Sequence, residues 1–399
     1  MLVRKLSKQT QALEVAREIA DRLVLERGTD GRLDTSASGI AGHGGVAIFM
    51  AAMLQVRPVR DYEELMHASM KAAAHSTALR GGLFGGPYGL LATCKYVSLV
   101  EPRYESLLTK CANALTALPP PVLAPASLFY DYDLISGCAG QVIALASALG
   151  PQEARSRCDY LVWLIEDVSR WSCPHPLERD SAPVNNLGMA HGLAGVLAAL
   201  AIGAPRESRY DEALAAGLDY LCQQGDPIFG WPSNVSPRDT GPTRSAWCYG
   251  TPGCAAAIFL AASRLGASES KALAVAGLRS LAAQPVGGWR LSDHAICHGY
   301  SGAALIFAAA AQESGDAELL RVSNMLVDVV LENFNRDSKL GYRARTLEGL
   351  TDSFSLLEGA AGIGLSLLTL AGACDSSWMN YLGLPPLQPS PNADHALAS

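Results

Sequence analysis

The sequence predicts an all-α fold, an α/α toroid in which seven helical hairpins close into a ring. The first observation is a Gly-x-x-Gly signature that occurs seven times, each time before a run of small apolar residues. The second is that alanine and leucine dominate the chain, while alternation typical of strands is scarce. Repeats of about 50 residues fit two helices with their loops, and such periods indicate repeat arrays. The first glycines are Gly42, Gly86, Gly137, Gly192, Gly250, Gly299 and Gly359, so successive copies lie 44, 51, 55, 58, 49 and 60 residues apart.

The segments between the glycines differ in a way that assigns them to two layers. The runs directly after each signature, such as 46–49, 196–200 and 303–307, are apolar on all sides and should form buried inner helices. Segments 210–223 and 317–332 carry charges on one face and should form outer helices. An open array needs polar terminal repeats. The last copy is as apolar as the others, which favours a closed ring.

The glycines themselves have a mechanical explanation. A turn into a tightly packed inner helix needs either a positive φ or a close approach of two backbone segments, and glycine permits both. The chain of 399 residues is long for one domain, yet no low-complexity linker or long charged block divides it. We expect residues 1–384 to form one toroidal domain. The segment 385–399 is rich in proline and polar residues and should be a flexible tail.

Charge and cysteine content exclude several classes of function. The net charge is −7, and no basic cluster follows the first few residues, which argues against nucleic-acid binding. No apolar run reaches the ~20 residues of a spanning helix, and the charged N-terminus is unlike a signal peptide. We therefore expect a cytoplasmic protein without direct membrane insertion. The ten cysteines are dispersed, which favours reduced thiols with a metal or catalytic role over a disulfide framework.

Three residues predict a metal site because of their place in the repeat. Cys248 and Cys297 each stand two residues before the first glycine of neighbouring copies, and His298 follows Cys297. Equivalent positions of a ring converge on one rim. Adjacent residues inside a helix point about 100° apart, but a loop before a helix removes that restriction. His191 stands in an earlier copy at the position that His298 takes in its own.

The three side chains suit an open zinc site. Zinc prefers tetrahedral sulfur and nitrogen ligands, and catalytic zinc keeps three protein ligands with one open position. Two thiolates neutralise Zn²⁺ and leave a modest Lewis acid that is suited to holding an incoming sulfur. A free thiol, with a pKa of ~8.5, is mostly protonated near neutral pH, and coordination deprotonates it. The alternative is that these cysteines are small core residues, the interpretation we adopt for the other eight.

The motifs together resemble the lanthionine synthetase C family. They are Gly188-Met189-Ala190-His191-Gly192 with Gly195, Trp247-Cys248-Tyr249-Gly250 with Pro252 and Gly253, and Cys297-His298-Gly299 with Gly302; the similarity extends from Gly39 to Gly362. The resemblance implies a zinc-dependent toroid, here a stand-alone class I lanthipeptide cyclase. Such an enzyme adds cysteine thiols of a dehydrated precursor peptide to dehydroalanine or dehydrobutyrine and closes thioether rings.

The resemblance also implies roles for individual residues. The zinc ligands fall on Cys248, Cys297 and His298, and the active-site histidine on His191, which would act as acid or base. Further counterparts are Arg244, which could stabilise a developing enolate, Asp133, which could orient His191, and Tyr249, which could donate a hydrogen bond. Each has a structural alternative, since Arg244 could pair with a carboxylate, Asp133 could cap the third inner helix and Tyr249 could simply pack.

Other functions and partners stay open at the level of sequence. A relative that adds glutathione or another small thiol to dehydrated residues would use the same zinc chemistry. A toroid like the protein prenyltransferases would also activate a thiol, but its expected carboxylate ligand is missing. A non-catalytic peptide-binding scaffold would need no open metal position. The expected partners of a cyclase are the dehydrated precursor peptide, with its leader and core, and the cognate dehydratase and transporter.

Overall fold

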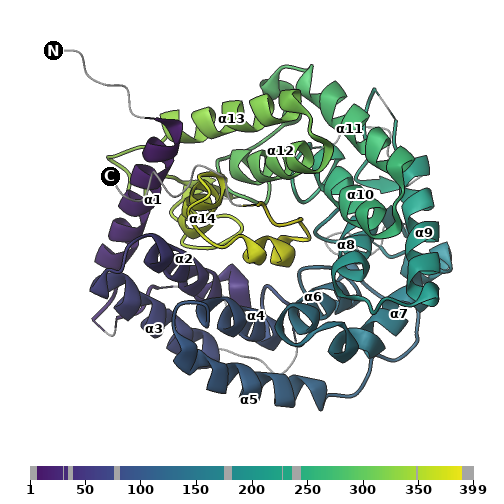
Figure 1. Cartoon of the computed structure of the whole chain (residues 1–399), viewed down its shortest axis with the longest axis horizontal. Coiled ribbons are helices and arrows are strands. Elements are labelled where there is room, and N and C mark those ends of the chain that lie inside the picture. The colour runs from purple at the N-terminus through teal and green to yellow at the C-terminus, as the bar shows by residue number, and fades with distance from the viewer. Residues whose placement is uncertain are drawn as a thin grey trace.

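Fourteen α-helices form two concentric layers in the computed structural model, which describes residues 7–29, 31–34, 39–75, 81–174, 182–226, 228–235, 244–346 and 349–388. Each inner helix contacts the next one around the ring, and the last contacts the first (Figure 1). The predicted α/α toroid is therefore confirmed. The inner helices are α2 (His43–Val56), α4 (Pro87–Val97), α6 (Cys138–Leu149), α8 (Leu193–Gly203), α10 (Thr251–Leu265), α12 (Tyr300–Ser314) and α14 (Ala360–Leu370). The outer helices are α3 (Arg60–His75), α5 (Glu105–Thr116), α7 (Arg155–Ile165), α9 (Ser208–Gln223), α11 (Ser268–Ala282), α13 (Ala317–Glu332) and α1 (Lys8–Leu25).

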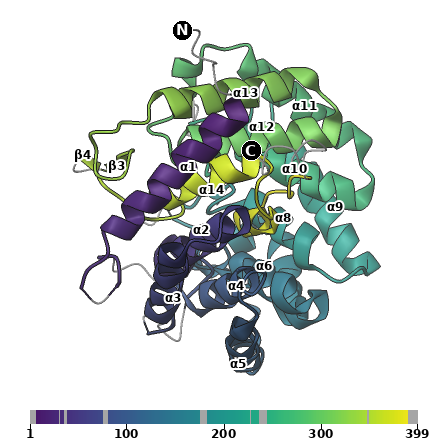
Figure 2. The same cartoon turned by 60° about the vertical axis from the view of Figure 1, so that its left-hand side comes forward.

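The seventh hairpin joins the two ends of the chain. Six inner helices are each followed directly by their outer partner, but α14 packs against α1, the first helix of the sequence (Figure 2). The α1 helix buries one apolar face that includes Ala16, Ile19 and Leu23. Apolar residues at spacings of three and four fall on one side of a helix. Closure of the ring therefore depends on a contact between segments that are far apart in sequence.

Close approach of the backbone explains the second glycine of each signature. A Cβ added to Gly89 would lie 2.2 Å from the Leu83 carbonyl oxygen, and one at Gly195 would lie 2.3 Å from that of Met189. The other five copies show the same conflict with a preceding carbonyl. The first glycine of each signature is the N-cap of its inner helix, but only Gly250 there has a positive φ, of 84°. The requirement for positive φ thus applies at one copy, and the steric requirement at all seven.

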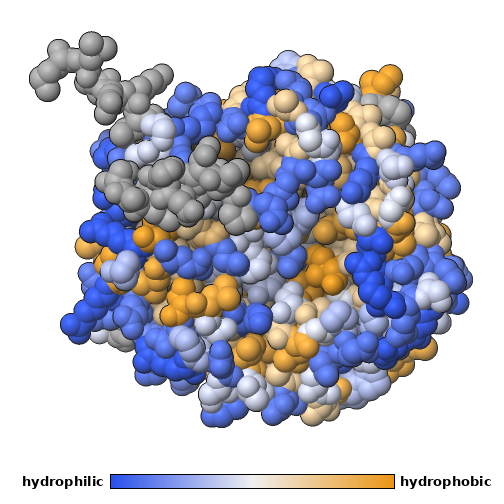
Figure 3. Space-filling view, in the orientation of Figure 1, coloured by the Kyte–Doolittle hydropathy of each residue, from blue (hydrophilic) through white to orange (hydrophobic). Residues whose placement is uncertain are grey.

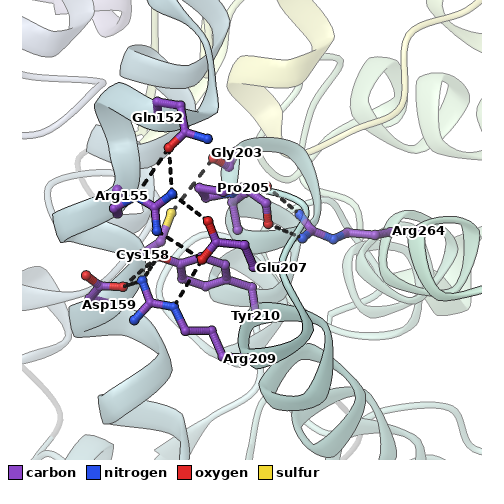
Figure 4. Close-up of polar contacts among 11 residues, drawn as sticks. Gln152, Arg155, Cys158, Asp159, Gly203, Pro205, Glu207, Arg209, Tyr210 and Arg264 are labelled. Atoms are coloured by element: carbon purple, nitrogen blue, oxygen red, sulfur yellow. Dashed lines mark hydrogen bonds and ion pairs between the residues drawn. The ribbon is translucent and has the colours of Figure 1, made fainter.

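Polar contacts hold neighbouring hairpins together around the outer layer. The buried Arg264 guanidinium, at the end of α10, donates to the carbonyl oxygens of Leu200, Ala204 and Pro205, at 2.8, 2.7 and 2.7 Å. The Leu200 carbonyl belongs to the last turn of α8 and the other two follow its end, where a positive charge is favourable. Arg155 of α7 pairs with Glu207 before α9 in the adjoining network (Figure 4). Hydrophilic residues dominate the outer edge of the face seen in Figure 3.

The centre of the ring is filled from one end by the segment after α14. The 3₁₀ helix η7 (Ser377–Leu382) contacts α4 and α6 and buries Trp378 and Met379. The Tyr381 hydroxyl donates to the Ala92 carbonyl at 2.9 Å, and the Trp247 indole donates to the Leu382 carbonyl at 2.8 Å. Residues 385–388 follow it from a buried proline to the exposed Gln388, which donates its backbone N–H to the Gln312 side chain at 2.6 Å. Residues 389–399 of the expected tail lie outside the described residues.

The remaining elements are short. Two antiparallel ribbons occur among the described residues, β1 (Asn185–Asn186) with β2 (Asn234–Val235) and β3 (Ala344–Thr346) with β4 (Gly349–Thr351). None of the described helices is both long enough and apolar enough to cross a membrane. The other 3₁₀ turns are η1 (Gly39–Ala41), η2 (Pro102–Tyr104), η3 (Phe129–Asp131), η4 (Pro151–Ala154), η5 (Val168–Trp171) and η6 (Val286–Trp289).

Candidate metal centre

A belt of backbone hydrogen bonds brings the repeat motifs to one rim. The Cys248 N–H donates to the Cys297 carbonyl at 3.1 Å, and the Ala190 N–H donates to the Cys248 carbonyl at 3.3 Å. Equivalent bonds continue in both directions, so each loop before an inner helix is tied to the next. The rim therefore collects side chains from loops that belong to different copies of the repeat, such as Cys248 and Cys297, which are 49 residues apart in sequence. The remaining links are Cys297 to Leu357, Leu134 to Ala190, Phe84 to Ile135 and Ala41 to Phe84.

The ligand atoms of Cys248, Cys297 and His298 lie within 4.8 Å of one another. Cys248 precedes α10 and Cys297 and His298 precede α12, so the cluster joins two neighbouring hairpins. Both cysteines are free thiols, and Cys248 is buried. Two thiols and one imidazole at this separation fit the donor set of a zinc ion with an open fourth position. The residues present therefore fit the metal that the motifs imply.

Asp293 contacts the imidazole of His298 at its Nε2 atom. Its carboxylate Oδ2 lies 3.3 Å from Nε2 of His298, and its Oδ1 accepts the Ala295 N–H at 2.9 Å. Metal-binding histidines commonly use one ring nitrogen for the metal and donate the other to a carboxylate, which fixes the orientation of the ring. Since Nε2 faces Asp293, Nδ1 is the nitrogen left for a metal.

The electrostatics of the cluster favour one thiolate and a charged imidazole when no metal is bound. The pKa of Cys248 lies below its usual value. The adjacent Cys297 thiol is the main cause of this lowering, and His298 is the second. The same contact between the two thiols raises the pKa of Cys297. The pKa of His298 is raised to about 9, mainly by its hydrogen bond to Asp293 and secondly by its contact with Cys248. The cluster therefore already contains the negative charge on sulfur that a metal cation requires.

His191 and Asp133 form a dyad on the same rim. Nδ1 of His191 lies 2.5 Å from Oδ2 of Asp133, which is fully buried, while the His191 side chain is partly exposed. The other carboxylate oxygen, Oδ1, accepts the N–H groups of Ser136 and Gly137 at 2.7 and 2.8 Å. Asp133 therefore holds the turn that leads into α6, whose first residue is Cys138, and also contacts His191. With Nδ1 engaged, Nε2 of His191 is left to face the site.

Tyr249 and Arg244 act on the site in different ways, Tyr249 through ring contact with His191 and Arg244 through its charge. The Tyr249 hydroxyl accepts a hydrogen bond from the Asn186 amide at 3.3 Å, and its ring centroid is 6.4 Å from that of His191. Burial raises the pKa of Tyr249 to about 12, so the phenol is protonated at neutral pH. Arg244 is exposed and follows directly on residues that the structure does not describe. Its charge adds to the lowering of the pKa of Cys248 and opposes the larger effects that raise the pKa of Cys297.

Three residues of the site are absent from the sequence-based prediction. Asp293 contacts His298, Asn186 contacts Tyr249, and the Tyr130 ring meets the His191 ring edge to face at 5.8 Å. Asp293 lies six positions before Gly299, whereas Asp133 lies four before Gly137, so the repeat register does not align the two carboxylates. Asn186 and Tyr130 lie outside the glycine motifs, so their positions in the sequence do not identify them as site residues.

The fold and the site define a helical toroid with a cluster of two cysteines and one histidine on its rim. The chain belongs to the lanthionine synthetase C-like protein family, whose model matches residues 34–382. Among solved structures it is similar to nisin cyclase, with a TM-score of 0.68, 19% identity and coverage of 93% of this chain and 96% of that chain. At this identity the similarity concerns the fold.

Two sugar epimerases are also similar, at lower scores. A sugar epimerase from a ruminal bacterium has a TM-score of 0.47 and 11% identity over 90% of this chain and 98% of that one. Cellobiose 2-epimerase from Spirochaeta thermophila has a TM-score of 0.48 and 12% identity over 95% and 99%.

Proposed function

We propose that the protein is a zinc-dependent lanthipeptide cyclase. It adds cysteine thiols of a dehydrated precursor peptide to dehydroalanine or dehydrobutyrine residues of the same peptide. The observation that carries the proposal is the convergence of Cys248, Cys297 and His298 on the rim that also holds the His191–Asp133 dyad. A structural zinc site alone would not require an acid–base pair beside it.

The metal has one chemical task in this proposal. Cys248, Cys297 and His298 would hold Zn²⁺, which when bound keeps the substrate thiol deprotonated near neutral pH. Asp293 holds the His298 ring in place through Nε2.

The proton balance assigns a task to His191. Addition forms a bond between the substrate sulfur and the β-carbon of the alkene, and the alkene electrons move to give an enolate. The thiol proton leaves, and a proton must return to the α-carbon. His191 can accept the first and deliver the second through Nε2, because Asp133 holds Nδ1 and fixes the orientation of the ring. No atom is gained or lost, so the peptide mass stays constant.

The developing negative charge assigns tasks to two further residues. Arg244 already acts electrostatically on both site thiols, and its guanidinium can stabilise the enolate oxygen in the same way. Tyr249 is a protonated phenol that can donate a hydrogen bond to the peptide. The partners follow from this chemistry: a dehydrated precursor, the dehydratase that supplies it and a transporter for the product. A cytoplasmic location accords with thiols that must stay reduced.

Incubation with a dehydrated, cysteine-containing peptide tests the proposal. We expect the peptide to lose its capacity for thiol alkylation at unchanged mass, and the loss to depend on zinc. A mass increase by one glutathione, when glutathione is supplied, would instead indicate addition of a small thiol. The Cys297→Ser variant serves as the control for uncatalysed addition. Thiols that remain fully alkylatable in the presence of zinc-loaded protein would contradict ring closure, and the further absence of a mass increase with glutathione would contradict both activities.

A further inference from the structure

A cavity lined in part by the η3 turn contains a buried arginine without an acidic partner. The cavity measures about 650 Å³ and lies between α4, α6, α7 and the loop 118–127. Arg157 of α7 lines it and is only 4% exposed. Among the described residues, no carboxylate pairs with its guanidinium, although Asp131 also lines the cavity. Buried charges are normally paired, so an unpaired one calls for an explanation.

The contacts that Arg157 does make are all with neutral groups. Its guanidinium donates to the Tyr88 hydroxyl at 2.9 Å, to the Ser156 hydroxyl at 3.1 Å and to the Leu115 carbonyl at 3.5 Å. Its Nε is buried and has no hydrogen-bond partner. The group that would complete this set is an anion with two acceptor atoms, such as a carboxylate, which a guanidinium binds through paired hydrogen bonds.

The rest of the lining is suited to a carboxylate with apolar neighbours. The Tyr88 hydroxyl accepts from Arg157, which leaves its own hydrogen for a further acceptor, and the Gln141 amide also lines the cavity. The loop at the cavity contains three consecutive prolines and exposes Val122, which is 81% accessible, and Leu123. A small inorganic anion has no apolar part that could contact this surface, whereas a peptide does. The Asp131 carboxylate accepts the Ser127 and Leu128 N–H groups at 2.7 and 3.0 Å.

The cavity is connected to the candidate active site by one short element. The η3 turn contributes Asp131 to the cavity and Tyr130 to the contact with His191. A peptide held in the cavity would therefore leave it next to the dyad. We infer that this cavity is an anchoring site for the peptide substrate, in which Arg157, Tyr88 and Gln141 bind an aspartate, glutamate or terminal carboxylate flanked by apolar residues. The identity of the occupant as substrate rests on the proposed function.

Binding of two matched probes tests the inference. N-acetyl-Leu-Asp-Leu-amide and N-acetyl-Leu-Asn-Leu-amide differ by one charge, and titration calorimetry measures their affinities for the intact protein. We expect the aspartate probe to bind at least roughly tenfold more tightly, because a hydrogen bond to a charged group contributes more than a neutral one. Equal affinities would overturn the inference. Displacement of the aspartate probe by inorganic phosphate at equal affinity would overturn the assignment to a peptide.

Substitutions separate binding from a structural role. Arg157→Met keeps the aliphatic volume and should abolish the preference for aspartate without lowering the thermal midpoint, since removal of an unpaired buried charge relieves its desolvation. Arg155→Met removes the same charge from the same helix at a surface pair with Glu207, and should keep the preference. A preference that survives Arg157→Met, or is lost in Arg155→Met, contradicts the inference.

A second substitution covers the case in which Arg157→Met unfolds the protein. Tyr88→Phe keeps the ring and removes the hydroxyl donor, so a loss of affinity for the aspartate probe at unchanged thermal midpoint supports the site, and unchanged affinity overturns it. Cys248→Ser distinguishes this inference from the proposed function. It removes a candidate zinc ligand and should stop ring closure, while the preference for the aspartate probe persists. Failure of ring closure in the wild type would leave this binding result standing.

Discussion

Asp133 uses its two carboxylate oxygens for different tasks, and a single substitution can separate them. Asp133→Asn can still present an oxygen to the Ser136 and Gly137 N–H groups, but it loses the negative charge beside His191. We expect the rate of ring closure to fall by roughly 10²-fold or more, since positioned acid–base groups contribute about that factor. The thermal midpoint and zinc content should stay close to wild type. An Asn variant with full activity would remove the dyad from the mechanism.

Asp293 makes a comparable contact with the candidate zinc ligand His298. We expect Asp293→Ala to weaken zinc binding by roughly 10- to 100-fold, because groups that orient a metal-binding histidine contribute about this much. Competition with a chromophoric chelator measures the affinity. Glu358→Gln is the matched control, since the Glu358 carboxylate acts on Cys297 by charge, whereas the groups that act on His298 are Asp293 and Cys248. Equal effects of the two substitutions would show that charge, rather than contact, matters here.

The sequence could predict the candidate ligands, but not the residues that position them. Cys248, Cys297 and His298 follow the repeat register, so their convergence requires only that the repeats form a ring. Asp293 lies outside that register because it reaches His298 through an irregular loop that bonds back to its own backbone at Ala295. Arg157 carries no signal in the sequence, since an arginine on an outer helix resembles any surface charge until its burial is known.

At the level of single elements, the glycine signature makes a sharp steric prediction. Gly89→Ala places a Cβ 2.2 Å from the Leu83 carbonyl oxygen, where backbone on both sides must shift. We expect a loss of about 1 to 3 kcal/mol in the free energy of unfolding, as for other overpacked positions. Gly287→Ala in η6 is the control, because its added Cβ meets nothing within 4 Å. Comparable thermal midpoints for the two variants would contradict the steric account of the repeat.

The start of α13 provides a test of pH dependence. The Asp316 side chain accepts the Glu318 and Leu319 N–H groups and pairs with Arg279. Burial alone would raise the pKa of Asp316, but the Arg279 hydrogen bond and the two N–H groups hold it below its ordinary value. A carboxyl with a lowered pKa stabilises the fold above its unfolded pKa of about 3.9 and loses this effect as the pH falls through the folded pKa.

We therefore expect Asp316→Ala to cost about 1 kcal/mol near neutral pH, as for other N-caps. The difference from wild type should shrink below pH 4, as measured by thermal unfolding at a series of pH values. A difference that stays constant to pH 2 would show that the carboxylate charge contributes nothing to the cap.

The sequence predicts where the inner helices begin and that they are buried, but it does not predict that η7 fills the centre of the ring. Each inner helix follows a glycine signature and is apolar throughout, so local sequence defines its start and its burial. The η7 turn lies beyond the last repeat and buries Trp378 and Met379 against helices far away in sequence. Aromatic residues in a short segment near the C-terminus do not reveal such a contact, because only the closed ring creates the space that they fill.

At the scale of the whole molecule, α1 completes the outer layer where the two ends of the ring meet. The sequence predicts a closed ring from the apolar character of the last repeat, but α14 has no outer helix after it, and α1 takes that place. The α1 helix also contacts α13, α2 and α3. Gln9 donates to the Ala371 carbonyl at 2.7 Å, and Lys8 pairs with Asp328 at 2.7 Å. The two ends of the chain are therefore joined by one amphipathic helix.

Substitutions on opposite sides of α1 test this closure. Ile19 is fully buried, so Ile19→Ala should cost about 2 to 5 kcal/mol, through lost burial and the cavity left behind. Leu25, on the same helix, is 81% exposed, and Leu25→Ala should change stability by less than about 0.5 kcal/mol. Thermal unfolding of both variants measures the difference. If α1 closes the ring, Ile19→Ala should also speed hydrogen exchange in α14 and α2, its neighbours, more than in α8 across the ring. Uniform acceleration, or none in α14, would show that the ring holds together without this helix.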